Sequence, residues 1–169
     1  IRSHFRDELR QERFTTDKTG AKTIEMFGAS FIADEPAIFG TPNQEYIDKE
    51  IVWYQSMSNN INDINPDGEP PAAWKYAASK HGEINSNYGL LTMSEQYHNQ
   101  LGNVADELFR NPDSRRACMI YNRPSIWNEY DKGGMSDFIC TNAVSYMIRD
   151  DKLISVVQMR SNDVVYGYK

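Results

Sequence analysis

The chain has 169 residues, a length that suits one domain with its own core, and 40% of its residues are hydrophobic and 25% charged. Its net charge of −6 argues against a general nucleic-acid or membrane-surface binder, so any anion site must be a local basic cluster. The two cysteines, the absence of metal-binding His or Cys spacings and the absence of a membrane-length apolar run predict a protein of a reducing, cytoplasmic compartment with no metal site.

Helical and β-type patterns alternate along the chain. In the first half they predict an amphipathic helix over residues 1–9, a turn over 17–20, β-strands over 23–27 and on to residue 32, a helix over 44–57, a loop over 59–71 and a short helix over 74–78. In the second half they predict an irregular stretch over 82–89, a helix N-capped by Ser94 that reaches Leu108, a strand over 117–121 and a hairpin over 138–159.

The helix over residues 44–57 carries an acid within an apolar stripe. Tyr46, Glu50, Trp53 and Met57 recur at helical spacing. Burying an ionised carboxylate among aromatic rings is costly, so we expect the pKa of Glu50 to rise toward that of a proton-handling group. The alternative is a surface glutamate at the edge of the stripe.

The predicted hairpin joins three kinds of reactive side chain. Cys140 lies on its first strand, and Arg160 and Asp163 follow its second strand. The hairpin would bring the thiol, the guanidinium and the carboxylate to one end of the sheet, and a thiolate needs positive potential nearby to exist at neutral pH. By strand alternation, Phe138, Cys140 and Asn142 are expected to share one face, provided that no bulge intervenes. The alternative for Cys140 is a structural cysteine, which is also the role expected for a buried Cys118 on the strand over 117–121.

Three motifs resemble the thymidylate synthase family. They are Cys140 with Gln158-x-Arg160-Ser161-x-Asp163-Val164 and Gly167, the run Asp113-Ser114-Arg115-Arg116, and the stretch Gly82 to Gly89. The sequence of these motifs resembles most closely that of the phage branch of the family, the deoxycytidylate (dCMP) hydroxymethylases. The similarity runs over essentially the whole chain. Synthases typically have Pro-Cys-His where this chain has Ile139-Cys140-Thr141, which also favours that branch.

The resemblance implies an α+β fold, in which helices pack on a mixed, twisted β-sheet, and a single domain over residues 1–169. Because members of the family are longer, the chain is expected to lack a C-terminal part of that domain. The residue that distinguishes cytosine from uracil in the family falls after Lys169. The preference for cytosine is therefore expected from the overall resemblance alone.

The activity implied by the resemblance is a one-carbon transfer to carbon 5 of dCMP. Cys140 would add to carbon 6 of the pyrimidine, 5,10-methylenetetrahydrofolate would supply the carbon as co-substrate, and water addition would give 5-hydroxymethyl-dCMP. The alternatives are a thymidylate synthase, a dUMP hydroxymethylase, a catalytically inactive nucleotide-binding relative and an RNA-binding regulator. A viral member would act in the cytoplasm of its host.

The resemblance also assigns roles to individual residues. The catalytic residues would be Cys140, Glu50, Tyr88 and Asp163; the substrate would contact Lys18, Arg115, Arg116, Arg160, Ser161 and Asn142; the folate would contact Trp74, Asp163 and Glu50. Arg115 and Arg116 would reach the phosphate bound to the other subunit of a homodimer. Simpler alternatives are a solvated turn lysine at Lys18, packing roles for Trp74 and Tyr88, and an arginine that faces solvent.

Overall fold

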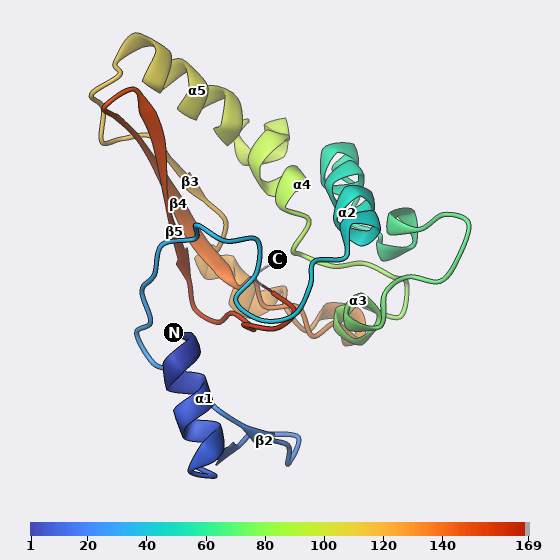
Figure 1. The fold of residues 1–169 in the computed structure, drawn as a ribbon. Coiled ribbons are helices and arrows are strands. Elements are labelled where there is room, and N and C mark those ends of the chain that lie inside the picture. Colours follow the sequence, from blue (N-terminus) through green and yellow to red (C-terminus); the bar gives the residue numbers. More distant parts are fainter. Residues whose placement is uncertain (168–169) are drawn as a thin grey trace. The chain divides into compact units, whose positions relative to one another are not determined.

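The computed structural model describes residues 1–167 and groups them into two compact units (Figure 1). One unit is formed by Ile1–Asn43 together with the segment that begins at Asp163, and the other is formed by Gln44–Asn162. Each unit is described by itself below. The single domain over 1–169 remains a prediction.

The smaller unit begins with the expected amphipathic helix, α1, at Arg2–Arg10. A small hairpin follows, in which β1 (Thr15–Thr16) pairs antiparallel with β2 (Lys22–Thr23). The turn between them is closed by Asp17, whose side chain accepts a hydrogen bond from the Thr19 amide at 2.8 Å. The expected turn over 17–20 is therefore confirmed.

The prediction of strands over residues 23–32 was wrong, because β2 ends at Thr23. Phe27 and Ile32 are 89% and 83% exposed, so their side chains pack on no sheet within the described residues. A β-rich run becomes a strand only where a partner strand completes its hydrogen bonds. Within the described part of this unit, β2 pairs only with the two residues of β1.

The larger unit combines helices with an antiparallel sheet, which confirms the expected α+β class. Its helices and strands are α2 (Gln44–Ser56), the 3-10 turn η1 (Ile61–Ile64), α3 (Ala72–Ala77), α4 (Tyr88–Met93), η2 (Glu95–Tyr97), α5 (Gln100–Arg110), β3 (Cys118–Ile120), η3 (Pro124–Asn128), η4 (Lys132–Gly134), β4 (Thr141–Arg149) and β5 (Lys152–Met159). The described strands lie in the order β3-β4-β5, and both pairs run antiparallel.

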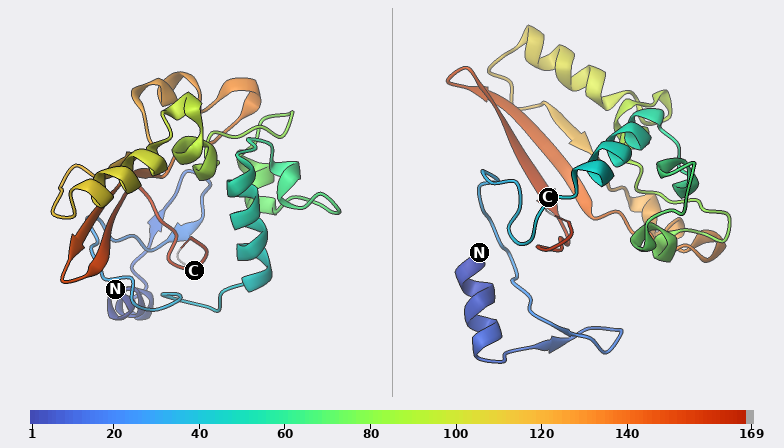
Figure 2. Two further views of the ribbon diagram at one scale, coloured as in Figure 1. Left: turned by 90° about the horizontal axis from the view of Figure 1, so that it is seen from above. Right: turned by 45° about the vertical axis from the view of Figure 1, so that its right-hand side comes forward.

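Helix α5 covers one face of this sheet and runs toward the turn between β4 and β5, as Figures 1 and 2 show. Val104 and Leu108 of α5 are buried against Ala117 and Met119, as the predicted apolar stripe requires. A second core lies under α2 and joins Trp53 to Ile61, Ile64 and Ile84. A third joins Leu91, Ile126 and Ile139.

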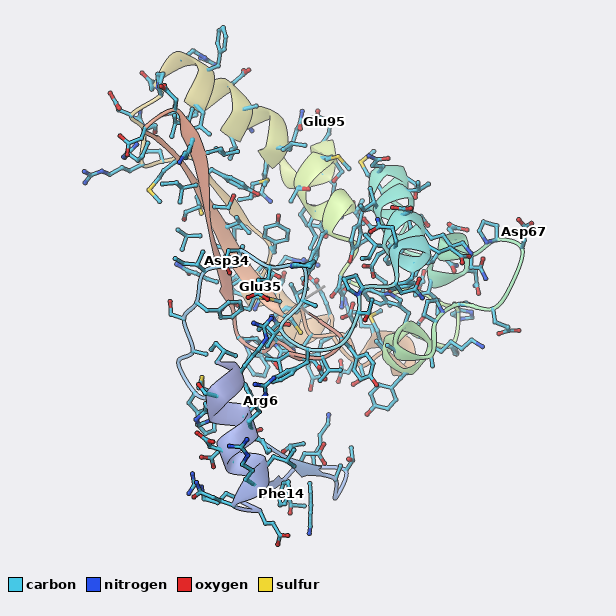
Figure 3. All side chains as sticks on the ribbon, in the orientation of Figure 1. Arg6, Phe14, Asp34, Glu35, Asp67 and Glu95 are labelled. Carbon is cyan, nitrogen blue, oxygen red and sulfur yellow. The ribbon has the colours of Figure 1, made fainter. Side chains whose placement is uncertain are left out.

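Three element boundaries differ from expectation. The helix expected from Ser94 begins instead at Gln100, because His98 and Asn99 adopt left-handed backbone angles and the Asn99 side chain caps α5. The loop expected over 59–71 contains η1, whose Ile61 and Ile64 are buried; Asp67 lies at the outer end of the same loop (Figure 3). The irregular stretch over 82–89 ends earlier than expected, since α4 begins at Tyr88.

Candidate active site

The β4–β5 hairpin fixes which residues meet at its open end. Asp150 and Asp151 both have positive φ angles, 53° and 57°, as a two-residue hairpin turn of type I′ requires. From this turn the pairing runs to Thr141 opposite Met159. The next residues are Cys140 and Arg160, and the Arg160 amide donates a hydrogen bond to the Cys140 carbonyl at 2.9 Å.

The Arg160 side chain folds back over the thiol. Its Nη2 donates to the Cys140 sulfur at 3.5 Å and to the Phe138 carbonyl at 2.6 Å, and its Nε donates to the Ile139 carbonyl at 3.1 Å. The guanidinium carbon also lies 5.0 Å from the centre of the Phe138 ring. The expected meeting of the thiol and the guanidinium is therefore confirmed. Cys140 is a half-buried residue and so is not sealed within the core.

A common face for Phe138, Cys140 and Asn142 was expected only if no bulge intervened. Strand β4 begins only at Thr141, and a β-bulge lies between Thr141 and Ala143, so strand alternation does not apply. The side chain of Asn142 accepts a hydrogen bond from Asn122 at 3.1 Å. The residue of this stretch that contacts Tyr88 is Thr141, whose hydroxyl donates to the phenol oxygen at 3.0 Å.

Tyr88 lies on the first turn of α4, and the buried Asn87 holds this turn in place. The Asn87 side chain caps α4 by accepting from the Leu90 amide at 2.8 Å and donates to the carbonyls of Trp53 and Ser58. Burial raises the pKa of Tyr88 above its ordinary value of 10.0, although the hydrogen bond from Thr141 acts in the opposite direction. The phenol is therefore protonated at neutral pH.

A buried acid next to the nucleophile loop was missed in the sequence. Asp137, 7% exposed, accepts hydrogen bonds from the Ser86 hydroxyl at 2.6 Å and from the amides of Asn85 and Ser86 at 2.6 and 2.8 Å. These bonds join the segment before Tyr88 to the segment before Cys140. The only signal in the sequence is a carboxylate three positions before the cysteine, and that signal does not identify its partners.

Glu50 and Trp74 meet at the packing of α2 on α3. Glu50 is half-buried, as the stripe predicted, and its Oε1 accepts from the Tyr46 hydroxyl at 2.6 Å and from the Trp74 indole at 3.2 Å. The Trp74 ring also packs edge-on against Trp53, with 5.2 Å between the ring centres. Trp74 is thus part of the core, yet it keeps some exposed surface with which to border a flat ligand.

The basic residues assigned to the substrate lie at several places in the fold. Arg116 forms an ion pair with Glu107 of α5, with Nη2 3.0 Å from Oε1. Arg115 is exposed, and so is Ser161, which directly follows Arg160. In the smaller unit, Lys18 lies in the turn after β1, and the Asp163 carboxylate accepts from the amides of Val165 and Tyr166 at 2.7 and 2.9 Å. The roles of these residues stay predictions.

Cys118 is half-buried, where the sequence predicted a buried thiol. It lies at the edge of the sheet, accepts a weak hydrogen bond from the Ser145 hydroxyl at 3.7 Å, and lines a hollow of about 190 Å³ together with Glu107 and Arg116. Within residues 1–167 there is no group of three or more His, Cys, Asp or Glu side chains that could hold a metal ion. None of the helices in that range is long and apolar enough to span a bilayer.

Comparison with known proteins identifies relatives of this chain. The chain is 54% identical, over all 169 residues, to the deoxycytidylate 5-hydroxymethyltransferases of Enterobacteria phages T4 and T2, and it covers 68% of the length of each. Its structure superposes on the crystal structure of thymidylate synthase from T4 phage with a TM-score of 0.72 at 22% identity, covering 98% of this chain and 63% of that one. At that identity the superposition supports the fold alone.

The sequence profile of thymidylate synthase matches residues 3–169, which include the Cys140 and Arg160 pair, Tyr88 and Glu50. The match covers nearly the whole chain, and the identity to the phage enzymes extends over all 169 residues, so the similarity is not confined to a shared motif. The chain therefore belongs to the thymidylate synthase family.

Proposed function

We propose that the protein transfers a one-carbon unit from 5,10-methylenetetrahydrofolate to carbon 5 of dCMP and yields 5-hydroxymethyl-dCMP. The observation that carries the proposal is the position of the Arg160 guanidinium, 3.5 Å from the Cys140 sulfur. The sulfur of Cys140 is the nucleophile that the reaction needs, and the guanidinium in contact with it can also pair with an anionic substrate. The identity to two phage deoxycytidylate 5-hydroxymethyltransferases supports the same substrate and product.

In the proposed reaction, the Cys140 sulfur bonds to carbon 6 of the pyrimidine, and the displaced electron pair makes carbon 5 nucleophilic. Carbon 5 then bonds to the one-carbon unit and loses its proton, a step that the Tyr88 phenol and Glu50 with ordered water assist. Tetrahydrofolate leaves, and a methylene group remains on the ring. Water adds to that carbon, and the sulfur departs from carbon 6 as the ring regains its double bond.

The remaining residues would bind the two substrates. Arg160 and Ser161, with Lys18, would contact the phosphate of the nucleotide; Asn142 would contact the nucleotide near the bulge of β4. Trp74, Glu50 and Asp163 would contact the folate. The folate would supply only the one-carbon electrophile. The ring of Trp74 is partly exposed, so it could stack against the flat ring system of such a ligand.

A homodimer would complete the site, with Arg115 and Arg116 directed at the phosphate bound to the partner subunit. The sheet face opposite α5 supports this, because Ile120, Ile154 and Val156 are 60%, 41% and 43% exposed there. In this geometry Arg116 would exchange its ion pair with Glu107 for the phosphate of the partner's nucleotide.

Since free thiols and intracellular nucleotides are needed, we infer that the protein works in a reducing cytoplasm.

The test is a product assay in which the purified protein is incubated with methylenetetrahydrofolate and either dCMP or dUMP. We expect 5-hydroxymethyl-dCMP and tetrahydrofolate from dCMP, and no product from the Cys140→Ser variant. Formation of dihydrofolate with a methylated base would instead identify a thymidylate synthase. Turnover of dUMP in place of dCMP would overturn the cytosine assignment, and binding of dCMP without turnover would identify an inactive relative.

A further inference from the structure

The carboxylate of Glu50 lies next to the polar side chains of Tyr46 and Trp74. The Tyr46 hydroxyl donates to Glu50 Oε1 at 2.6 Å, and the Trp74 indole N–H lies 2.8 Å from the Tyr46 oxygen and 3.2 Å from the same Oε1. We propose that Tyr46 is a positioning residue that fixes the Glu50 carboxylate for its proton transfers. The inference rests on the proposed function, and it assigns Tyr46 a role that the motifs of the sequence do not.

The three side chains come from two helices, α2 and α3. Tyr46 and Glu50 are four residues apart on α2 and therefore lie on the same face of the helix. Trp74 comes from α3, and its ring packs edge-on against Trp53, which is 1% exposed. The Trp53 indole in turn donates to the Asn60 carbonyl at 3.0 Å, so the aromatic support of the group is itself fixed.

The electrostatics keep Tyr46 a hydrogen-bond donor. Burial raises the pKa of its phenol, and the hydrogen bond to Glu50 raises it further, because a phenolate next to a carboxylate would be repelled. Tyr54, also on α2, has its pKa raised by burial and by the charge of Glu50. The titratable groups that face Glu50 from α2 are thus two neutral phenols, and α3 contributes the uncharged indole of Trp74.

A carboxylate held in this way has little freedom to rotate. In water a glutamate side chain samples several rotamers, and an acid or base acts well only when it lies within hydrogen-bond reach of the proton it transfers. The bond from Tyr46 removes part of this freedom before substrate binds. Its loss should therefore slow the chemical steps more than it weakens nucleotide binding.

The experiment compares Tyr46→Phe with Tyr76→Phe in the full chain. Tyr76, on α3, is 69% exposed and serves as the matched control. For Tyr46→Phe we expect kcat to fall about 10-fold to 100-fold, the effect of one charge-assisted hydrogen bond, with KM for dCMP changed by less than about threefold. Tyr76→Phe should match the unsubstituted protein. In a Glu50→Gln background, Tyr46→Phe should lower kcat by less than about twofold, because Tyr46 acts through Glu50.

A second measurement reports on the geometry without turnover. The protein has three tryptophans, and the indole N–H signal of Trp74 in a nitrogen-15 NMR spectrum should move in Tyr46→Phe, while those of Trp53 and Trp127 stay in place. Trp74→Phe, which removes the indole donor, provides a second variant and should also lower kcat. An unchanged kcat and an unmoved Trp74 signal, or an equal loss in the Glu50→Gln background, would overturn the role of Tyr46. Failure of the unsubstituted protein to make product would instead contradict the proposed function.

Discussion

The ring of Tyr88 stacks on the ring of Tyr54, with 5.7 Å between their centres and 11° between their planes. Tyr54 lies on α2 beside Glu50, and Tyr88 lies on α4 beside Thr141, which precedes the bulge of β4. The stack therefore connects the two ends of the candidate site, the carboxylate and the nucleophile loop. Its geometry depends on how closely α4 approaches α2.

That close approach depends on Gly89. A Cβ atom on Gly89 would lie 1.7 Å from the Tyr54 carbonyl oxygen, a backbone atom that no rotamer change can move. We expect Gly89→Ala to lower the free energy of unfolding by about 3 kcal/mol, as in severe overpacking, and to separate the two rings. Urea unfolding followed by tyrosine and tryptophan fluorescence measures this.

Gly102→Ala is the matched control for Gly89→Ala. Its Cβ would meet the end of the Asn99 side chain at 2.9 Å, and this side chain can turn away at the loss of one N-cap bond, about 1 kcal/mol. If the two variants were equally stable, the contact of Gly89 with Tyr54 would not limit the packing of α4 on α2.

The contact between Arg160 and Cys140 predicts unequal reactivity of the two cysteines. At neutral pH, iodoacetamide should alkylate Cys140 faster than Cys118, because Cys140 is the proposed nucleophile and a guanidinium contacts its sulfur. Arg160→Gln should slow alkylation of Cys140 about tenfold and leave Cys118 unchanged. Peptide mass spectrometry after timed quenching gives both rates in one sample. A rate at Cys140 that is the same in both proteins would show that the guanidinium does not activate the thiol.

The Tyr88 phenol and the Thr141 hydroxyl can be tested against each other. Tyr88→Phe and Thr141→Val both remove the 3.0 Å hydrogen bond, so each should cost about 1 kcal/mol of stability. Since only the phenol is proposed to assist removal of the carbon 5 proton, Tyr88→Phe should lower kcat about 100-fold, and Thr141→Val much less. Exchange of tritium from carbon 5 of labelled dCMP follows this step directly. Equal losses in the two variants would mean that Tyr88 has only a packing role.

The lowered pKa of Glu107 predicts that the folded protein loses stability in acid. The Ser114 hydroxyl, at 2.6 Å, and the Arg116 guanidinium hold the pKa of this carboxyl below its ordinary value of 4.5. The pKa is lower in the folded chain than in the unfolded chain, so the stabilisation is present above about pH 4.5 and is lost as the pH falls through the folded-state value. The melting temperature of the unsubstituted protein should therefore fall more steeply below that pH than that of Glu107→Gln. Parallel curves would contradict the assignment.

Several features of this protein follow from the sequence alone because their physical basis is local. The apolar spacing of residues 44–56 forms α2, and the Asp150-Asp151 turn sets the hairpin register that brings Cys140 and Arg160 together. Family motifs in the sequence identified Cys140, Arg160, Tyr88 and Glu50 as candidate site residues. The family match covers all of these positions.

Only the tertiary structure decided which distant groups meet. Asp137 and Ser86 are 51 residues apart, and Trp74 and Tyr46 are 28 apart, so no periodicity relates them. The bulge at Asn142 likewise depends on how β4 pairs with β5, and the hydrogen bond from Thr141 to Tyr88 joins residues that are 53 apart. Local propensity determines which segments become helices or strands, whereas packing between segments determines which side chains hold the reactive ones in place.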